Sequence, residues 1–357
     1  MARATTARIH IDALRHNLAR IRSAAPGSKV MAVVKADGYG HGLERVAQAL
    51  AGADAFGVAA LSDAQRLRAA GFSQSIVLLS GFDEVADLTQ LRDLSVVTVV
   101  HHPFQLEMLA ADSGSPISVW LKMDSGMHRL GFPPEQFHEA YRRLKEMPNV
   151  DDDIVCMSHF ASSDEPDNPQ TASQLACFDA LLPPDAQVCS LANSAAVLAW
   201  PASHRQWLRA GGALYGLSVA SGRTGSDFGL KPAMTLSTRL ISTQQVRAGE
   251  RVGYAGTYVC PEDMRIGVAA IGYGDGYPRN IRPGTPALLN GQRVPIIGRV
   301  SMDLMTVDLR SQTQAAVGDE LTLWGEGLPV EEIAEAAGTI SYELTCSITR
   351  RVRFRED

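Results

Sequence analysis

Residues 30–42 of this chain read VMAVVKADGYGHG, and this stretch sets the pattern for more than half of the sequence. The five apolar residues 30–34 are typical of a strand buried on both faces of a parallel sheet. Lys35 follows them directly, and the loop after it holds three glycines, which let a backbone pass close to a ligand. The amphipathic segment Leu43–Ala49 then indicates a helix. Strand, loop and helix in this order are one unit of an α/β fold.

The same alternation of strand and helix recurs as far as residue 210. Short apolar runs suitable for strands lie near Val30–Val34, Ala55–Ala60, Ile76–Leu79, Val96–Val100, Ile117–Met123, Asp153–Met157, Gln187–Leu191 and Trp207–Arg209. Amphipathic segments suitable for helices lie between them, at Leu43–Ala49, Asp63–Ala70, Phe104–Ala111, Glu135–Glu146 and Ser173–Leu182. Eight strand–helix units in this length predict a (β/α)8 barrel in preference to an open sheet.

The pattern changes after residue 230. Strand-like runs separated by turns rich in Gly, Pro and Asn, such as Asn290-Gly291, replace the alternation. They lie at Met234–Val246, Arg265–Ile271, Pro286–Leu289, Val294–Ile297, Leu304–Leu309, Glu320–Trp324 and Ser347–Arg355, with one helix expected at Val330–Ala337. We therefore expect a barrel domain at residues 12–230 and a mainly β domain at residues 231–357, which residues 1–11 join as a strand.

The composition is that of an ordinary globular protein. Of 357 residues, 45% are hydrophobic and 20% are charged, and the formal net charge is −6. Because basic residues are not in excess, we expect no nucleic-acid partner. The sequence has no apolar run of about 18 residues and no apolar leader, so we expect neither a membrane span nor a signal peptide. The five cysteines include no Cys-x-x-Cys pair, which favours free thiols in a reducing cytoplasm and argues against a metal site.

Lys35 is the first candidate for chemistry. In a barrel of this kind the carboxyl ends of the strands carry the active site, and Lys35 stands at the end of the first predicted strand. A lysine held against apolar residues can lose its proton near neutral pH and attack a carbonyl group to form a Schiff base. A solvated surface lysine is the more common outcome at such a position. Position alone therefore leaves both interpretations open.

Residues 35–42 resemble the pyridoxal-phosphate lysine signature of the alanine racemases. Seven further stretches match the same family in the same order: Lys122–Gly131, Ser158–Ala161, Ala192–Ala195, Arg209–Gly216, Val252–Tyr254, Gly272–Arg279 and Gly298–Asp303. The matches span essentially the whole chain. The resemblance implies an enzyme of fold-type III that uses pyridoxal 5'-phosphate (PLP). It also implies an N-terminal (β/α)8 TIM barrel with a C-terminal mainly β domain, which the strand count indicates independently.

The resemblance implies that two groups exchange the α-proton of the substrate. Lys35 binds PLP through a Schiff base, and its freed amine acts on the D-enantiomer. Tyr254, from the β domain, acts on the L-enantiomer from the opposite face. A tyrosine hydroxyl is a weak acid, so it needs partners to act as a base near neutral pH. His159 and Arg209 are matched to the hydrogen-bonded network that assists it.

Arg209 has a second implied role, at the pyridine nitrogen of the cofactor. Many PLP enzymes place a carboxylate there and so stabilise a protonated ring, whereas an arginine cannot accept that proton. The charge left at the substrate Cα is then less delocalised and shorter-lived. Return of the proton to Cα is thereby favoured over transamination.

The cofactor phosphate requires backbone N–H donors and hydroxyl groups. Gly211 and Gly212 can supply amides, and Ser194 and Tyr39 can supply hydroxyls. Barrels commonly bind phosphate after strands that are late in the order, and Ser194 and Gly211 follow the predicted seventh and eighth strands. Asn193 is included with Ser194, although an Asn-Ser pair can equally be an ordinary helix cap.

The resemblance also assigns residues to the substrate. Arg129 is matched to a contact with the cofactor's phenolic oxygen and the substrate carboxylate, and the backbone amide of Met302 holds the same carboxylate. Lys122 is matched to a lysine that is often carbamylated in this family and that orients the arginine. An unmodified Lys122 paired with a neighbouring acid is the alternative.

The remaining expectations concern the entrance to the active site and the oligomeric state of the protein. Tyr273 is matched to an aromatic gate and Arg279 lies near it, while Arg350 stands where some members have a tyrosine. Because Tyr254 reaches the site of the other subunit in the family, we expect a homodimer with shared active sites. The expected substrates are L-alanine and D-alanine.

Three alternatives remain open at this point. A racemase of broader or different specificity, such as one for serine, would share these motifs. A non-catalytic PLP-binding homeostasis protein shares a barrel and a strand-end lysine but lacks the β domain and an opposing tyrosine. An amino-acid decarboxylase of related fold presents an acidic partner to the pyridine nitrogen, where this chain has Arg209. Biosynthesis and catabolism of D-alanine are both compatible with the sequence.

Overall fold

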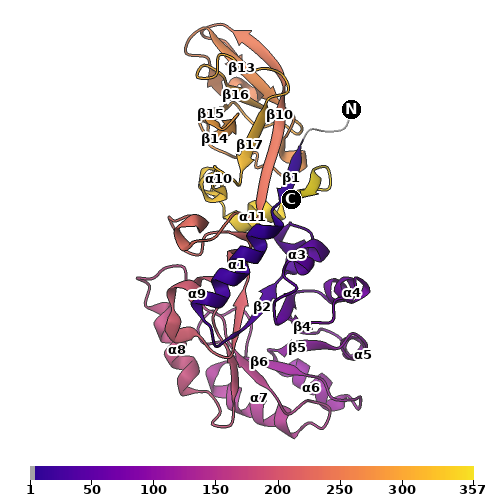
Figure 1. The fold of residues 1–357 in the computed structure, drawn as a ribbon. Coiled ribbons are helices and arrows are strands. Elements are labelled where there is room, and N and C mark those ends of the chain that lie inside the picture. Colours follow the sequence, from indigo (N-terminus) through magenta and orange to yellow (C-terminus); the bar gives the residue numbers. More distant parts are fainter. Residues whose placement is uncertain (1–4) are drawn as a thin grey trace. The chain divides into compact units, whose positions relative to one another are not determined.

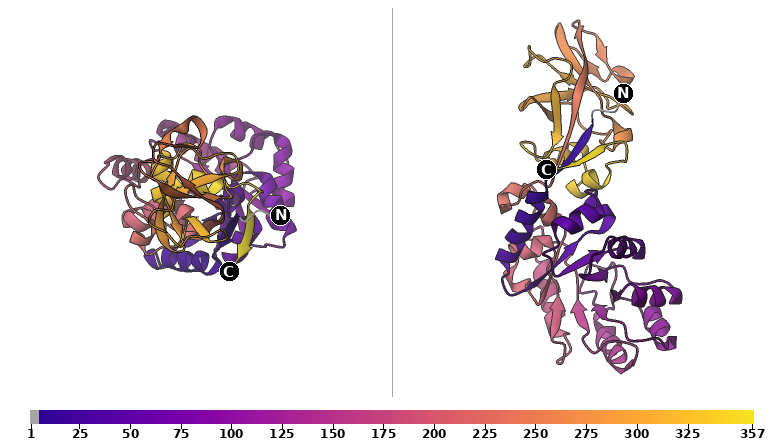
Figure 2. Two further views of the ribbon diagram at one scale, coloured as in Figure 1. Left: turned by 90° about the horizontal axis from the view of Figure 1, so that it is seen from above. Right: turned by 45° about the vertical axis from the view of Figure 1, so that its right-hand side comes forward.

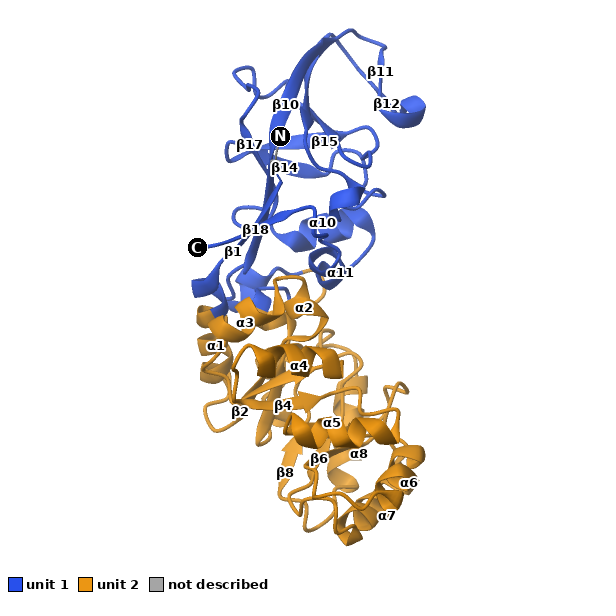
Figure 3. Cartoon of the chain, turned by 90° about the vertical axis from the view of Figure 1, so that its right-hand side faces the viewer, with its two compact units in different colours: residues 1–14, 215–218, 223–357 blue, residues 15–214, 219–222 orange. Residues whose placement is uncertain are grey.

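A computed structural model describes residues 5–357 of the chain. The chain divides into two compact units (Figure 3). One unit comprises residues 15–214 with 219–222, and the other comprises residues up to 14, 215–218 and 223–357. None of the described helices is long and apolar enough to cross a membrane.

The unit of residues 15–214 contains a closed barrel of parallel strands (Figure 1). Each strand pairs with the next one along the chain, and the last pairs with the first, with Leu208 opposite Val30. The strands are β2 (Lys29–Val33), β3 (Ala55–Val58), β4 (Ser75–Leu78), β5 (Val96–Val100), β6 (Val119–Lys122), β7 (Val155–Met157), β8 (Val188–Ser190) and β9 (Trp207–Ala210). The predicted (β/α)8 barrel is confirmed, and its strands lie within or directly beside the predicted apolar runs.

Helices alternate with the barrel strands. They are α1 (Ile11–Ala24), α2 (Lys35–Tyr39), α3 (Leu43–Ala49), α4 (Leu61–Ala69), α5 (Val85–Asp93), α6 (Pro103–Ala111), α7 (Pro134–Glu146), α8 (Gln170–Ala180), α9 (Ser194–Ala199) and the 3-10 turns η1 (Pro201–Ser203) and η2 (Gly212–Tyr215). The sequence did not indicate α5 or α9. Helix α5 buries only Leu88 and Leu91, and α9 has six residues. With so few buried apolar positions or so few residues, neither shows a clear apolar period.

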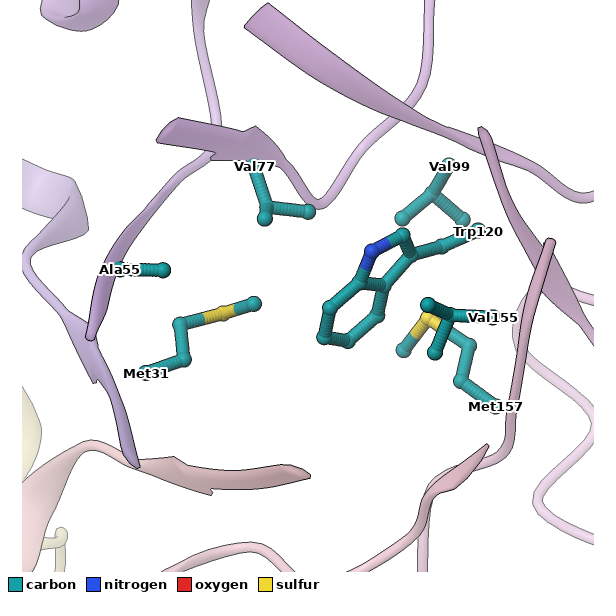
Figure 4. Close-up of a cluster of buried hydrophobic side chains, with 7 residues drawn as sticks. All are labelled: Met31, Ala55, Val77, Val99, Trp120, Val155 and Met157. Carbon is teal, nitrogen blue, oxygen red and sulfur yellow. The ribbon is translucent and has the colours of Figure 1, made fainter. Parts of the chain in front are cut away.

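The barrel interior is packed with side chains (Figure 4). Trp120 is its largest member and lies 5.7 Å from Trp207, measured between ring centroids. Smaller or flexible side chains fill the space around it: Met31, Ala55, Val77, Val99, Val155 and Met157. Because the interior is filled, a ligand of the barrel binds at the ends of the strands.

The second unit is built on an eight-stranded sheet with the order β13-β16-β15-β14-β17-β10-β1-β18, in which β13 also pairs with β10. Its strands are β1 (Thr6–Ile9), β10 (Met234–Val246), β13 (Met264–Ala269), β14 (Pro286–Leu289), β15 (Gln292–Ile297), β16 (Met305–Asp308), β17 (Glu320–Trp324) and β18 (Arg353–Glu356). A separate hairpin joins β11 (Arg251–Val252) to β12 (Tyr258–Val259). The other elements are η3 (Gly225–Phe228), η4 (Tyr254–Gly256), η5 (Tyr273–Asp275), α10 (Val330–Ala337) and α11 (Ser341–Cys346).

The N-terminal strand β1 belongs to this sheet. It lies between β10, to which it is antiparallel, and β18, to which it is parallel. In the right-hand view of Figure 2 the indigo strand runs beside the yellow C-terminal one. The expected strand within residues 1–11 is thus seen at Thr6–Ile9, and residues 1–4 lie outside the described part of the chain.

Two details of the β unit illustrate the strengths and limits of the sequence patterns. Asn290 and Gly291 have φ angles of 50° and 80° and join β14 to β15, as the Asn-Gly signature predicts. The strand expected at Ser347–Arg355 is wrong over most of its length, because only Arg353–Glu356 is extended. Instead, the N–H of Thr349 donates to the carbonyl oxygen of Asp275, and its hydroxyl donates to that of Gly274.

Candidate active site

Lys35 lies at the carboxyl end of β2, where the sequence places it, and begins the short element α2. The backbone after it is left-handed: Ala36, Asp37 and Tyr39 have φ angles of 54°, 52° and 52°. Tyr39 is buried, whereas Asp37 is exposed. The sequence indicated a glycine-rich loop here, but it did not indicate left-handed conformation at residues with side chains.

Arg209, in β9, is buried and contacts the ends of the two preceding strands. Its Nη1 donates to the carbonyl oxygen and the hydroxyl of Ser190, at 2.8 and 2.7 Å. Its Nη2 donates to the carbonyl oxygens of Ser158 and Leu191, at 2.5 and 3.1 Å. A guanidinium group has five N–H donors and no acceptor, so it is suited to a set of partners that are all hydrogen-bond-accepting oxygens.

His159 accepts a further hydrogen bond from Arg209. The distance from Nη2 of Arg209 to Nδ1 of His159 is 3.2 Å. A guanidinium group can only donate, so Nδ1 of His159 is the acceptor and the ring is neutral with its proton on Nε2. Burial lowers the pKa of His159 well below its ordinary value, and the positive charges of Arg209, Arg129, Lys122 and Lys35 act in the same direction. The structure thus brings Arg209 and His159 together and fixes the tautomer.

Four cationic side chains act on one another at this end of the barrel: Lys35, Lys122, Arg129 and Arg209. Burial, followed by the charges of Arg209 and Arg129, lowers the pKa of Lys122 to about 8. Burial and the charge of Arg129 lower the pKa of Arg209 to about 9, which leaves it cationic at neutral pH. Like charges held together in this way are stabilised by an anionic ligand. The cluster therefore fits a molecule that carries phosphate or carboxylate groups.

The loop that carries Arg129 is organised by Asp124. Its Oδ1 accepts the backbone N–H groups of Gly126, Met127 and His128, each at 3.0 Å. Gly131 closes the loop with a φ of 135°, and a Cβ there would lie 2.5 Å from the backbone nitrogen of Asp124. Arg129 is exposed on this loop. Asp124 was not singled out in the sequence, although an Asp followed by Gly two residues later is a recognisable turn signal.

Ser194, Gly211 and Tyr39 lie together, as predicted. The hydroxyl oxygen of Ser194 accepts the N–H groups of Gly211 and Ala213, at 2.8 and 3.2 Å. A Cβ on Gly211 would lie 2.5 Å from the hydroxyl oxygen of Tyr39, so a larger residue there would require Tyr39 or the backbone to move. Gly212 begins the turn η2. This arrangement has the small residues and hydroxyls that a phosphate group requires.

Asn193 acts as a helix cap. Its Oδ1 accepts the N–H of Ala196 at 3.0 Å and the hydroxyl of Ser163 at 2.9 Å. The cap begins α9 at Ser194 and so fixes the position of that serine. The helix-cap interpretation of Asn193, left open by the sequence, is the one seen in its side-chain contacts.

The remaining predicted residues belong to the β unit and are exposed. Tyr254 begins η4 after Gly253, whose φ is 73°, and 65% of its surface is accessible. Tyr273 is 40% accessible and Met302 is 52% accessible. Arg279 is exposed as well. All four side chains are therefore accessible from the surface of this unit.

The turn of Tyr273 and the turn of Met302 are bonded to each other. The N–H of Tyr273 donates to the carbonyl oxygen of Ser301 at 3.0 Å, and the N–H of Gly274 donates to that of Met302 at 2.9 Å. Tyr254 lies apart from them in sequence, between the strands of the β11–β12 hairpin.

Arg351 links the same two turns through their acids. Its Nε lies 3.3 Å from Oδ1 of Asp275, and its Nη2 donates to Asp303. Asp275 is fully buried and also accepts the N–H of Gly272. The family resemblance singled out Arg350, but the contacts to these two acids come from its neighbour Arg351, which the sequence did not indicate. No spacing rule relates residue 351 to residues 275 and 303, so this contact had no sequence signal.

Comparison with known proteins identifies the family. The alanine racemase N-terminal domain matches residues 9–219, and the alanine racemase C-terminal domain matches residues 233–355. The chain belongs to the alanine racemase family. An alanine racemase of Shewanella woodyi is 52% identical over 347 residues, and one of Shewanella sediminis is 53% identical, each alignment covering 97% of both chains.

Solved structures of the alanine racemase family superpose on the whole chain. The crystal structure of the biosynthetic alanine racemase from Pseudomonas aeruginosa matches with a TM-score of 0.97, at 44% identity and with full coverage of both chains. The alanine racemase from Acinetobacter baumannii matches with a TM-score of 0.92 at 35% identity, over 99% of this chain and 100% of that one. The family and the fold inferred from the sequence motifs are therefore confirmed.

Proposed function

We propose that this protein interconverts L-alanine and D-alanine with PLP as its cofactor, by a two-base mechanism, as a homodimer. Membership of the alanine racemase family supports the isomerase activity and the substrate. The observation that carries the chemical part of the proposal is the buried Arg209, bonded to a neutral His159 among further cations. This is a site for an anionic cofactor whose ring nitrogen faces a cation.

The described residues fit PLP group by group. Gly211, Gly212, Ser194 and Tyr39 would hold the phosphate, because the glycine leaves room beside the tyrosine hydroxyl. Asn193 contributes by capping the helix that presents Ser194. Lys35 would hold the cofactor covalently, Arg209 would face the pyridine nitrogen and Arg129 the phenolic oxygen. When bound, PLP supplies an electron sink for the charge left at Cα when the α-proton is removed.

Lys35 and Tyr254 are the proposed acid/base pair. Lys35 moves the α-proton on the face of the D-enantiomer, and Tyr254 moves it on the face of the L-enantiomer. His159 has its proton on Nε2 because Nδ1 accepts from Arg209, so Nε2 can donate to the tyrosine oxygen and stabilise its deprotonated form. Arg209 holds that histidine in a single tautomer.

Arg209 also directs the reaction to racemisation. Placed at the pyridine nitrogen, its guanidinium group would donate a hydrogen bond but keep its protons near neutral pH, because its pKa of about 9 lies above that range. Charge therefore stays close to Cα, where Lys35 or Tyr254 returns the proton. A carboxylate at this position would favour proton return to the cofactor and transamination.

The substrate carboxylate is the second anion of the site. Arg129 and the backbone amide of Met302 would hold it, and the two bonded turns of Tyr273 and Met302 would form one side of its approach. Tyr273 and Arg279 are the proposed gate. Lys122 is the proposed carbamylated residue, and its pKa of about 8 supports this because the uncharged amine is the form that reacts with CO2.

The homodimer follows from the placement of the two bases. Lys35 belongs to the barrel and Tyr254 to the β unit, and in the family the tyrosine serves the other subunit. Tyr254, Tyr273 and Met302 are exposed, so all three are accessible to a second copy of the chain. We further propose a cytoplasmic location, which the five free cysteines support. We also propose a role in D-alanine biosynthesis, which the likeness to the biosynthetic alanine racemase from Pseudomonas aeruginosa supports.

A panel of L-amino acids tests the function directly. The protein is incubated with PLP and each amino acid in turn, and the loss of optical rotation is followed. We expect loss with L-alanine and much slower loss with L-serine. Comparable rates across several amino acids would favour the broad-specificity alternative, and binding of PLP with no racemisation would favour the homeostasis protein.

A further inference from the structure

The backbone that follows Lys35 adopts a conformation that is unfavourable for most of its residues. Ala36 and Asp37 have φ and ψ angles of 54° and 50°, and 52° and 48°, and Gly38 follows with 63° and 44°. Tyr39 continues with a φ of 52°. In this left-handed region the Cβ of an L-residue crowds the following carbonyl oxygen. Four successive residues, from Ala36 to Tyr39, have positive φ angles. Such a run persists only where contacts with neighbouring parts of the protein hold it.

Backbone hydrogen bonds close the turn upon itself. The N–H of Gly38 donates to the carbonyl oxygen of Val34 at 2.9 Å, and the N–H of Gly40 donates to that of Ala36 at 3.0 Å. The N–H of Gly42 donates to the carbonyl oxygen of Asp37 at 2.8 Å. These bonds run within the turn, so they do not fix it to the neighbouring elements of the barrel.

The side chain of Asp37 connects the turn to two neighbouring helices. Its Oδ1 accepts the N–H of Leu43, at the start of α3, at 3.1 Å. The same oxygen accepts Nη2 of Arg66 at 2.9 Å. Asp37 is thus bonded both to the next helix in the sequence and to a residue in α4.

Arg66 is hydrogen-bonded to two acids at once, and a third, Asp63, lies 3.8 Å from its Nη1. Its Nε and Nη2 donate to the two carboxylate oxygens of Glu44, at 2.9 and 2.8 Å, while Nη2 also reaches Asp37. The carboxylates of Glu44 and Asp37 raise the pKa of Arg66 and hold it charged. One guanidinium group therefore ties α4 to α3 and to the left-handed turn. A bidentate geometry of this kind fixes direction as well as distance.

We propose that Arg66 is a positioning residue for Lys35. By holding Asp37 against α3 and α4, it keeps residues 36–39 left-handed, and the turn in this form sets the directions of Lys35 at its start and Tyr39 at its end. Arg66 touches neither the cofactor nor the substrate. The inference rests on the proposed function, because Lys35 and Tyr39 are the residues that would hold PLP.

The test compares Arg66→Gln with a matched control, Arg142→Gln. Arg142 is also exposed and also binds two acids, Glu139 and Glu146, but it lies on α7. The affinity of the PLP-free protein for PLP is measured by absorbance titration, and kcat and KM for alanine are measured separately. We expect Arg66→Gln to raise the PLP dissociation constant about fivefold, the most that one exposed ion pair ordinarily supplies. We expect kcat to fall, KM for alanine to stay unchanged, and Arg142→Gln to behave as the wild type.

Two further variants separate positioning from general stability. Asp37→Asn keeps an acceptor oxygen for Leu43 but removes the charge that attracts Arg66, so its effect on PLP affinity should not add to that of Arg66→Gln. Arg66→Lys keeps the charge but not the fork, so it should restore the affinity only in part. Thermal unfolding midpoints of all variants are recorded alongside.

The outcomes distinguish this inference from the proposed function. If the wild type binds PLP and racemises alanine while Arg66→Gln matches Arg142→Gln in both measurements, Arg66 is not a positioning residue and the function stands. The inference would also be overturned if both arginine variants lost affinity for PLP in proportion to the fall in their thermal unfolding midpoints. If the wild type neither binds PLP nor racemises alanine, the proposed function fails and the inference fails with it.

Discussion

Lys122 shows how the cationic cluster at the strand ends changes the chemistry of a single residue. A lysine in water is almost fully protonated at neutral pH, whereas burial together with Arg209 and Arg129 lowers the pKa of Lys122 to about 8. Its uncharged fraction therefore rises steeply between pH 6 and pH 9, and only that fraction can react with CO2. The cluster thus makes a carbamate possible and would be partly neutralised by it.

We expect carbamylation of Lys122 to increase with pH through about 8. Labelled bicarbonate and carbon NMR of the protein measure the carbamate, with Lys122→Ala as the reference that lacks the signal. Lys29, on the surface beside Trp207, provides a control lysine. Removal of CO2 at low pH should raise KM for alanine, and bicarbonate should reverse the effect. A protein that shows no carbamate at pH 8.5 would contradict this assignment.

Tyr254→Phe should separate the two halves of racemisation. The variant lacks the hydroxyl that acts on L-alanine but retains Lys35. We expect racemisation to fall at least about a hundredfold, the usual contribution of a general acid or base. Exchange of the α-proton of D-alanine with deuterated water should continue with retention, as measured by proton NMR and chiral analysis. Equal loss of exchange from both enantiomers would refute the two-base scheme.

Arg209→Glu should change the reaction rather than only slow it. A carboxylate facing the pyridine nitrogen can share a proton with the ring, so more charge leaves Cα and transamination increases. The ratio of pyruvate formed to alanine racemised measures this partition. Arg209→Lys, which keeps the positive charge, is the control and should form no additional pyruvate. An unchanged ratio in the glutamate variant would remove this account of Arg209.

At the scale of elements, the turns around the barrel ends decide where these residues point. The left-handed turn after β2 is closed by backbone hydrogen bonds within the turn, whereas the start of α9 and the Gly211 turn rest on the side-chain oxygens of Asn193 and Ser194. The sequence located all three regions by their Gly, Asn and Ser content. It did not indicate their conformations, because the positive φ angles at Ala36 and Tyr39 have no local preference behind them.

Gly211→Ala tests the close approach in the proposed phosphate site. A Cβ at this position would lie 2.5 Å from the hydroxyl oxygen of Tyr39, so either that side chain or the backbone must move. We expect the affinity for PLP to fall about tenfold, a cost of ~1.4 kcal/mol that overpacking commonly reaches. Gly27→Ala is the control, because a Cβ there meets nothing within 4 Å. Absorbance titration with PLP measures both variants, and equal affinities would argue against this site.

At the scale of the whole molecule, the proposed active site needs two chains. Mixing the inactive variants Lys35→Ala and Tyr254→Phe tests this without any measurement of dimer affinity. A heterodimer would contain one site with both native groups and one with neither. Random exchange gives heterodimers in half of the molecules, so activity should recover to about a quarter of the wild-type value. No recovery after exchange, with heterodimers verified by native mass spectrometry, would mean that each site is built within one chain.

The sequence by itself determined the fold class, the family and the chemical types at the site. Apolar periods are a local property, and they identified the eight barrel strands and Lys35 at the end of the first, while the resemblance to the family assigned residues such as Arg209 and Tyr254. Only the tertiary structure decided which atoms meet. The neutral tautomer of His159, the loop held by Asp124 and the links made by Arg66 and Arg351 depend on hydrogen bonds between segments whose separation along the chain follows no rule. Such contacts form once the packed elements bring the charges together, and the sequence pattern therefore carries no mark of them.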